Sequence, residues 1–130
     1  ALGEQMYETM GIAREDKAAR LNQVLQNFEF FGAPVGLFFS IDTRMNPNQW
    51  GHLGMFIMSV MLAAEEKGLA TCAQEAWMTR CKTIAATLGL DETQRIWCGM
   101  ALGHADPDAA VNDLRSERAP VDEFSKFEGF

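Results

Sequence analysis

The sequence predicts an α+β fold, and three observations support this fold class. Residues 50–64 carry no charge, and their large apolar side chains recur at the 3–4 spacing of a helix. Residues 34–42 and 95–103 are dense in β-favouring side chains and end in turn residues, as strands do. The chain has 130 residues, which is enough to bury one core, so a single domain over residues 1–130 is expected.

The chain begins with two expected helices and a strand. Residues 2–10 have the spacing of a short helix that Gly11 ends. Residues 16–31 carry a longer apolar stripe, and the Gly-Ala-Pro sequence at 32–34 stops it. The strand over residues 34–42 follows, and its high apolar content predicts an internal position in the sheet.

The central element is the helix that begins at Trp50 and ends before Gly68, which has the position of a left-handed C-cap. Over residues 53–64 its only polar side chain is Ser59. A helix that is apolar nearly all round is expected to be buried. Residues 70–76 follow as a tight loop of small and polar residues, which we expect to hold backbone amides in place against a ligand.

The later elements are a helix over residues 79–88, which Gly89 ends, and a second strand over residues 95–103. The tail of residues 106–130 has few large apolar side chains, so it is expected to lie on another surface or to stay disordered. Two strands are too few for a stable sheet. The deficit indicates that further strands come from a missing N-terminal part, from a partner chain, or from both.

Composition limits the classes of partner. The formal net charge of -7 and the pI of about 4.7 argue against nucleic acid, whose binding needs a clustered basic surface. Residues 50–64 are too few to span a bilayer, and no signal-peptide pattern opens the chain, so no membrane partner is expected. The spacing of Cys72, Cys81 and Cys98 fits neither disulfide pairs nor a metal site. Free thiols and a cytoplasmic location are therefore expected.

No catalytic side chain and no metal site are predicted. His52 and His104 are not spaced as metal ligands and are interpreted as structural histidines. Arg115 and Arg118 have two interpretations from their chemistry. They could grip a phosphate in a bidentate manner, or they could belong to a solvated charge run that pairs with Glu117 and later acidic residues.

Three segments together resemble the FMN-dependent nitroreductase family. They are NFEFFGAPVGLFFSIDTRM from Asn27, WGHLGMFIMSVMLAAEEKGLATCAQEAW from Trp50, and CGMALGHADPDAAVNDLRSERAPVDEFSKFEGF from Cys98. The segment from Trp50 is similar to the family's long core helix with the flavin loop that follows it. The segment from Cys98 is similar to the family's Gly-His-Ala-Asp-Pro turn and its Arg-Ala-Pro-Val-Asp-Glu-Phe tail. These motifs cover most of the chain from Asn27 onward, and their combination is specific.

The resemblance implies helices around a small antiparallel sheet and an intertwined homodimer with two FMN molecules at the subunit interface. It implies that residues 106–130 reach the partner subunit and that residues 43–50 lie on the substrate side of the pocket. The implied reaction is a ping-pong transfer from NAD(P)H through FMN to a nitroaromatic, a quinone or a similar small molecule. The cofactor carries such a reaction, which agrees with a sequence that has no acid-base machinery.

Site residues follow from the same resemblance, position by position. Gln74, Glu75 and Ala76 match the loop whose backbone runs beside the isoalloxazine ring, where the small side chain of Ala76 would allow a close approach. Arg118 matches the tail arginine that contacts the FMN phosphate, and Ser116 occupies a neighbouring contact position.

The sequence departs from the family pattern at its start. The family's Arg-Arg-Ser phosphate grip and its Pro-Ser...Asn...Gln-Pro-Trp stretch do not occur, so an N-terminal part is expected to be missing. Charge-assisted hydrogen bonds worth about 1.5–3 kcal/mol each would be lost with it. Weaker FMN binding would follow. The alternatives are therefore a non-catalytic structural dimer that has lost FMN, or another reduction, such as dehalogenation, on the same scaffold.

Overall fold

The computed structural model describes residues 2–129, and a three-stranded sheet lies in their central part, Lys17–Ala105. Of the described residues, 2–16 and 106–129 make up a second unit. The single domain expected over residues 1–130 depends on how the two units join, so it stays a prediction.

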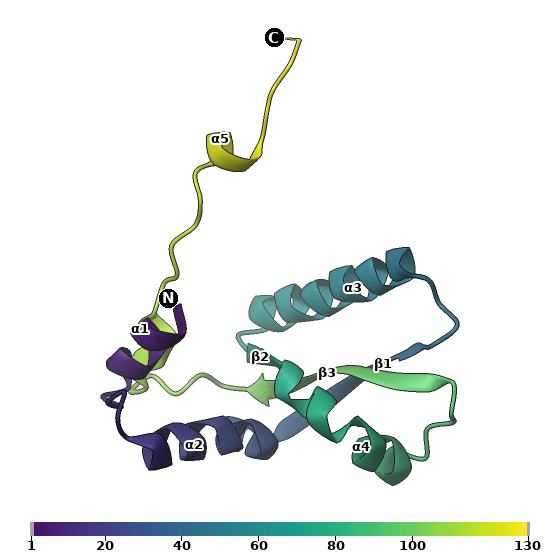
Figure 1. Ribbon diagram of the computed structural model, residues 1–130, viewed down its shortest axis with the longest axis horizontal. Helices are drawn as coiled ribbons and strands as arrows, with labels where there is room; N and C mark the ends of the chain where they lie inside the picture. The colour runs from purple at the N-terminus through teal and green to yellow at the C-terminus, as the bar shows by residue number, and fades with distance from the viewer. Residues whose placement is uncertain (1, 130) are drawn as a thin grey trace. The chain divides into compact units, whose positions relative to one another are not determined.

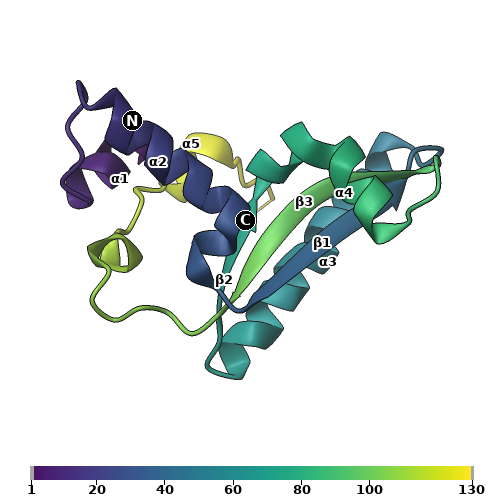
Figure 2. The same ribbon diagram turned by 90° about the horizontal axis from the view of Figure 1, so that it is seen from below.

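The sheet confirms the α+β class and is antiparallel throughout. β3 (Gln94–Gly103) lies between β1 (Val35–Asp42) and β2 (Ala70–Gln74), as Figures 1 and 2 show. The internal position expected for the first strand was wrong, because β1 is an edge strand of the described sheet. Its apolar content has another cause: Phe39 and Ile41 are buried by packing on the faces of the sheet, which does not require a strand on each side.

The segment expected to be a loop over residues 70–76 contains the third strand. Ala70–Gln74 pairs with β3 in antiparallel register from Ala70 opposite Gly103 to Gln74 opposite Gly99. Its small side chains lack the alternation that marks a strand in sequence. Residues 70–74 form a strand because this edge of β3 would otherwise be unpaired, and backbone N–H and C=O groups in a core need partners. With β2 in place, this chain alone supplies a three-stranded sheet.

The central helix is α3 (Pro47–Glu66), and local signals set both of its ends. It begins before the expected Trp50, because Asn46 accepts a hydrogen bond from the Asn48 amide while the Gln49 side chain accepts one from the Asn46 amide. Pro47 lies within this capping box as the first helical residue, which is a typical helix start. Gly68 follows the helix with φ of +71°, as predicted for a left-handed cap.

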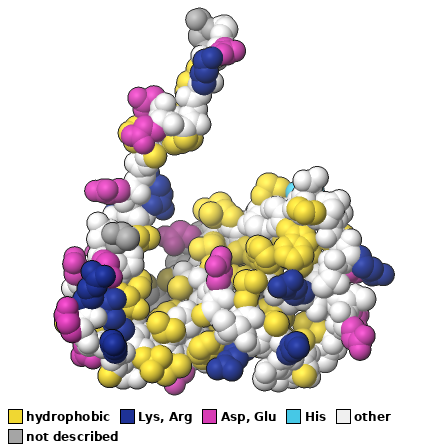
Figure 3. Space-filling view, in the orientation of Figure 1, with side chains coloured by type: hydrophobic (Ala, Val, Ile, Leu, Met, Phe, Trp, Pro, Cys, Tyr) yellow, Lys and Arg dark blue, Asp and Glu magenta, His cyan; other side chains and the backbone are white. Residues whose placement is uncertain are grey.

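Only one side of α3 is buried, so the expected all-round burial was wrong within this chain. Ile57 packs on Phe39, Cys98 and Met100 of the sheet, and Ala64 is the helix's other buried residue. The opposite side is exposed and apolar: Met55 62%, Phe56 57%, Met58 54% and Leu62 63%. Figure 3 shows hydrophobic side chains gathered at the surface over α3. Within residues 2–129, no helix combines the length and apolar character needed to span a membrane.

The first helices match the prediction in part. α1 (Leu2–Thr9) ends before Gly11, which has φ of +69°, as expected. α2 (Lys17–Leu25) stops well short of the expected residue 31 and gives way to a 3₁₀ segment, η1 (Gln26–Gly32). Within η1, Phe30 and Phe31 depart from helical geometry with φ of 52° and 53°, and the Phe30 ring packs on the sheet at Gly36.

The face of the sheet opposite α3 is covered by a second 3₁₀ segment, η2 (Glu75–Arg80), and by α4 (Cys81–Leu88), as the two ribbon views show. The expected helix over 79–88 therefore begins later, after η2. It ends as predicted at Gly89, which has φ of +65°. Ile84 is its buried side chain.

The other unit contains, besides α1, the short elements η3 (Ala110–Asp113) and α5 (Val121–Phe124). Phe124 is 70% exposed and Phe127 is 69% exposed. These exposed aromatic side chains agree with the expectation that the tail does not bury itself.

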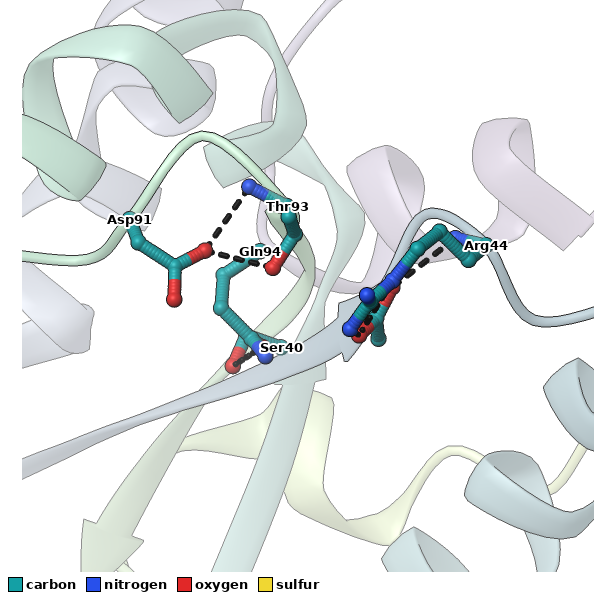
Figure 4. Close-up of polar contacts among 6 residues, drawn as sticks. Ser40, Arg44, Asp91, Thr93 and Gln94 are labelled. Atoms are coloured by element: carbon teal, nitrogen blue, oxygen red, sulfur yellow. Dashed lines mark hydrogen bonds and ion pairs between the residues drawn. The ribbon is translucent and has the colours of Figure 1, made fainter.

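Each of two turns at one end of the sheet has polar contacts within it (Figure 4). The Asp42 carboxylate accepts hydrogen bonds from the Arg44 amide at 2.9 Å and from Arg44 Nη2 at 2.5 Å. Asp91 accepts from the Thr93 amide at 2.8 Å and from its hydroxyl at 2.5 Å. The Thr43 amide donates to the Thr93 carbonyl at 2.7 Å, which ties the turn before α3 to the turn before β3.

The Asp42 contact predicts a pH effect on stability. Hydrogen bonds from the Arg44 side chain, then from its backbone, lower the pKa of Asp42 from 3.8 to about 2. A carboxyl whose pKa is lowered in the folded state stabilises the fold above about pH 4 and loses that contribution as the pH falls toward about 2. We expect Asp42→Asn to melt below wild type above pH 4 and the difference to shrink as the pH falls from about 4 through about 2. Melting temperatures across this range measure it, and a constant difference would contradict it.

Candidate functional site

The segment Gln74–Ala76 begins at a buried polar side chain. Gln74 ends β2 and is only 2% exposed. Its Nε2 donates to the Asn27 carbonyl at 2.9 Å and contacts Asn27 Oδ1 at 3.4 Å. The Asn27 side chain in turn donates to the Val24 carbonyl at 2.9 Å. The end of β2 is thereby tied to η1 and the C-terminal end of α2.

An aromatic cluster holds the other end of the segment. The Trp77 ring lies 4.8 Å from the Phe30 ring, 5.1 Å from the Phe28 ring and 5.1 Å from the Phe38 ring, measured between centroids. It rests on Gly99, where a Cβ atom would come within 2.2 Å of Trp77 Cδ1. The absence of a side chain at Gly99 is therefore what lets the indole approach the sheet.

Glu75 and Ala76 lie between these two anchors. Glu75 is exposed and Ala76 is half-buried, at the start of η2. Amides in the first turn of a helix have no partner within it. The small side chain of Ala76 also lets a flat group come close to the backbone. The arrangement is suited to presenting backbone donors to a planar ligand with acceptor atoms.

The second predicted group, Ser116 and Arg118, belongs to the other unit. Arg118 is exposed, and its Nη1 contacts the Ser116 hydroxyl, the Ser116 carbonyl at 3.4 Å and the Glu117 carbonyl at 3.2 Å. These three residues line an open hollow of about 260 Å³ together with Leu2 and Gln5 of α1. A guanidinium and a hydroxyl on one hollow are donors that suit a phosphate.

Each predicted group and each remaining candidate residue has its own surroundings. Gln74–Ala76 and Ser116–Arg118 fall in different units, so the structure describes each group by itself. Arg115 Nη1 donates to the Asn112 carbonyl at 2.9 Å. His52 and His104 are both exposed. In the described part of the chain, no three His, Cys, Asp or Glu side chains gather as a metal site would require.

The supporting residues of the Glu75–Ala76 turn were missed from sequence. Asn27, Trp77 and Gly99 lie far apart along the chain, and no spacing connects them. The one available signal was Gly99 itself. An isolated glycine inside an apolar strand pattern indicates a close approach of another group to the strand.

Comparison with known proteins gives similar nitroreductases. The 4-nitrobenzoate reductase of Pseudomonas putida is 42% identical over 128 residues, which are 98% of this chain and 56% of that protein. The FMN and NADPH-dependent nitroreductase NfnB from Sphigopyxis sp. strain HMH has a TM-score of 0.96 at 46% identity, over 99% of this chain and 58% of that one. NfnB from Mycobacterium smegmatis, solved in complex with NADPH, has a TM-score of 0.91 at 29% identity, over 98% and 57%.

The length of these matches and a family profile define the relationship. The chain spans about half the length of the curated relatives it matches. The profile of the Nitroreductase family matches residues 2–104, which include the sheet, α3 and the Gln74–Ala76 segment. The resemblance seen in the sequence is confirmed, and the chain belongs to the nitroreductase family.

Proposed function

We propose that this chain forms part of an FMN-dependent NAD(P)H oxidoreductase that reduces nitroaromatic, quinone or similar small acceptors. The observation that carries the proposal is the Glu75–Ala76 turn, which is held between the buried Gln74 amide and the Trp77 ring. The similar proteins support it: one is named a 4-nitrobenzoate reductase, and another is described as FMN and NADPH-dependent.

The residues present fit FMN in two places. The turn at Glu75 and Ala76 offers backbone donors and a small side chain to a flat ring, and Arg118 with Ser116 offers a cation and a hydroxyl to a phosphate. When bound, FMN supplies the transfer of electrons from NAD(P)H to the acceptor. The contribution of this chain is to hold and orient it. We propose no metal and no catalytic side chain.

We also propose that the chain acts as a homodimer. The exposed apolar side of α3 supports this, because a surface with several large apolar side chains marks a protein contact. The exposed Phe124 and Phe127 support the proposal that residues 106–130 lie on the partner subunit. The free thiols of Cys72, Cys81 and Cys98 support a cytoplasmic location.

FMN binding by the 130-residue chain tests the proposal. Titration followed by flavin fluorescence gives the affinity, and absorbance follows NADH- or NADPH-dependent reduction of 4-nitrobenzoate. A chain that binds FMN and turns over the acceptor supports the proposed enzyme. A dimer that does not bind FMN supports instead the non-catalytic structural dimer. Turnover of a halogenated phenol in place of the nitroaromatic would support the dehalogenation alternative.

Arg118→Ala is expected to weaken FMN binding by about 10- to 100-fold. The reason is the loss of a charge-assisted contact to phosphate, worth about 1.5–3 kcal/mol. The same titration measures it. Arg115→Ala is the matched control, since it removes an identical charge whose Nη1 contacts only the nearby Asn112 and Leu114 carbonyls among the described contacts. Equal affinity of Arg118→Ala and wild type would remove Arg118 from the site.

A further inference from the structure

We propose that the side chains of Gln74 and Trp77 are positioning residues that fix the backbone of Glu75 and Ala76 from both sides. The proposal rests on the proposed function in so far as this backbone meets FMN. We do not propose that either side chain contacts a ligand, because Gln74 is 2% exposed and the Trp77 indole nitrogen is buried.

The first anchor joins segments 47 residues apart. Gln74 Nε2 donates to the Asn27 carbonyl at 2.9 Å and contacts Asn27 Oδ1 at 3.4 Å. A partly buried hydrogen bond between distant segments restrains both of them. Since Gln74 immediately precedes Glu75, this bond limits where the chain can leave β2.

The second anchor is adjacent to the first on the same face of the sheet. Gln74 and Gly99 are paired residues in the register of β2 and β3. Side chains of paired residues point to the same face, with their Cβ positions about 4.5–5.5 Å apart. Trp77 Nε1 lies 2.9 Å from the place where a Cβ of Gly99 would be. The indole therefore fills the space beside the Gln74 side chain, and only a glycine at 99 leaves room for it.

Both anchors keep a polar atom without a partner. Among the described residues, Gln74 Oε1 and Trp77 Nε1 are buried side-chain atoms that make no hydrogen bond. Each such atom costs stability. An apolar side chain at either position would carry no such cost. Two buried polar atoms without partners, one on either side of the same turn, are better explained by the geometry that their side chains impose than by packing alone.

The test measures the order of the turn in the chain without FMN. We expect ¹⁵N order parameters near about 0.85 for the Glu75 and Ala76 amides in wild type, and below about 0.6 in Gln74→Met and in Trp77→Leu. Asn27→Ala should have a smaller effect, since the backbone carbonyl that accepts from Gln74 at 2.9 Å remains, while the longer contact to Gln74 and the local hydrogen bond from Asn27 to the Val24 carbonyl are lost. If Gln74→Met and Trp77→Leu do not fold, Asn27→Ala still tests the first anchor.

Gln94→Met is the matched control. It removes another side-chain hydrogen bond between distant parts of the same sheet, from the Ser40 hydroxyl to Gln94 Oε1 at 3.0 Å (Figure 4). It should leave the order of Glu75 and Ala76 unchanged. Unchanged order in both Gln74→Met and Trp77→Leu, or an equal loss in Gln94→Met, would overturn the proposal.

FMN affinity separates this proposal from the proposed function. We expect Gln74→Met to raise the Kd for FMN about tenfold, which is about 1.4 kcal/mol, and Gln94→Met to leave it unchanged. If Gln74→Met lowers the order parameters of Glu75 and Ala76 but leaves the Kd for FMN unchanged, the proposed role of Gln74 in FMN binding is wrong. If wild type binds no FMN, the proposed function fails, while the order parameters still decide whether Gln74 and Trp77 position the turn.

Discussion

Trp77→Ala is expected to lower the free energy of unfolding by about 3–5 kcal/mol, the usual cost of deleting a large aromatic side chain from a packed cluster. The ring contacts Phe28, Phe30 and Phe38 and covers Gly99, so its removal leaves a cavity against the sheet. Urea unfolding followed by far-UV circular dichroism measures the change.

Gly99→Ala provides the complementary variant. A Cβ at this position would lie 2.2 Å from Trp77 Cδ1, so the indole has to move, at a cost of about 1–3 kcal/mol. In a Trp77→Ala background the same substitution should cost much less, because the clash is absent. The two changes are therefore expected to be non-additive. Additive losses would show that the indole does not depend on Gly99.

Leu62→Glu is expected to convert a dimer of this chain into a monomer. Leu62 is 63% exposed and lies on the apolar side of α3 with Met55 and Met58. In a lone chain such a surface substitution changes stability little. In a dimer it would bury an unpaired charge, at a cost of about 3–5 kcal/mol. The dimer Kd should then rise by at least about 100-fold. Light scattering across a range of concentrations measures it.

Leu88→Glu is the control for this prediction. Leu88 ends α4 and is 50% exposed, so it introduces the same charge at a similarly exposed leucine on another helix. It should leave the oligomeric state as in wild type. A wild-type chain that is monomeric at every concentration, or a Leu62→Glu chain that remains a dimer, would refute the proposed interface.

Local signals predicted the ends of several elements. Gly11, Gly68 and Gly89 follow their helices with positive φ, as their positions in the sequence indicated. The composition of residues 95–103 identified β3 within one residue. The family resemblance identified the small antiparallel sheet, which three strands of this chain confirm. These features depend on neighbours in the chain, which a sequence displays directly.

Other features required contacts between distant residues. The composition of residues 70–76 predicts a loop, and the structure makes most of it a strand, because β3 offers an edge that needs a partner. The second helix ends at Leu25 and gives way to η1, in which the Phe30 ring packs on Gly36. Periodicity within the helix continued past this point and could not show it.

The amino-acid sequence alone is enough to assign the family, the β3 strand and the end of α3. Two features became known from the folded chain: α3 buries one side and exposes the other, and Gln74 and Trp77 enclose the Glu75–Ala76 turn. Both have one cause. Burial and side-chain hydrogen bonds depend on which distant segments meet, here Asn27 with Gln74 and Gly99 with Trp77, and no spacing along the chain records that meeting.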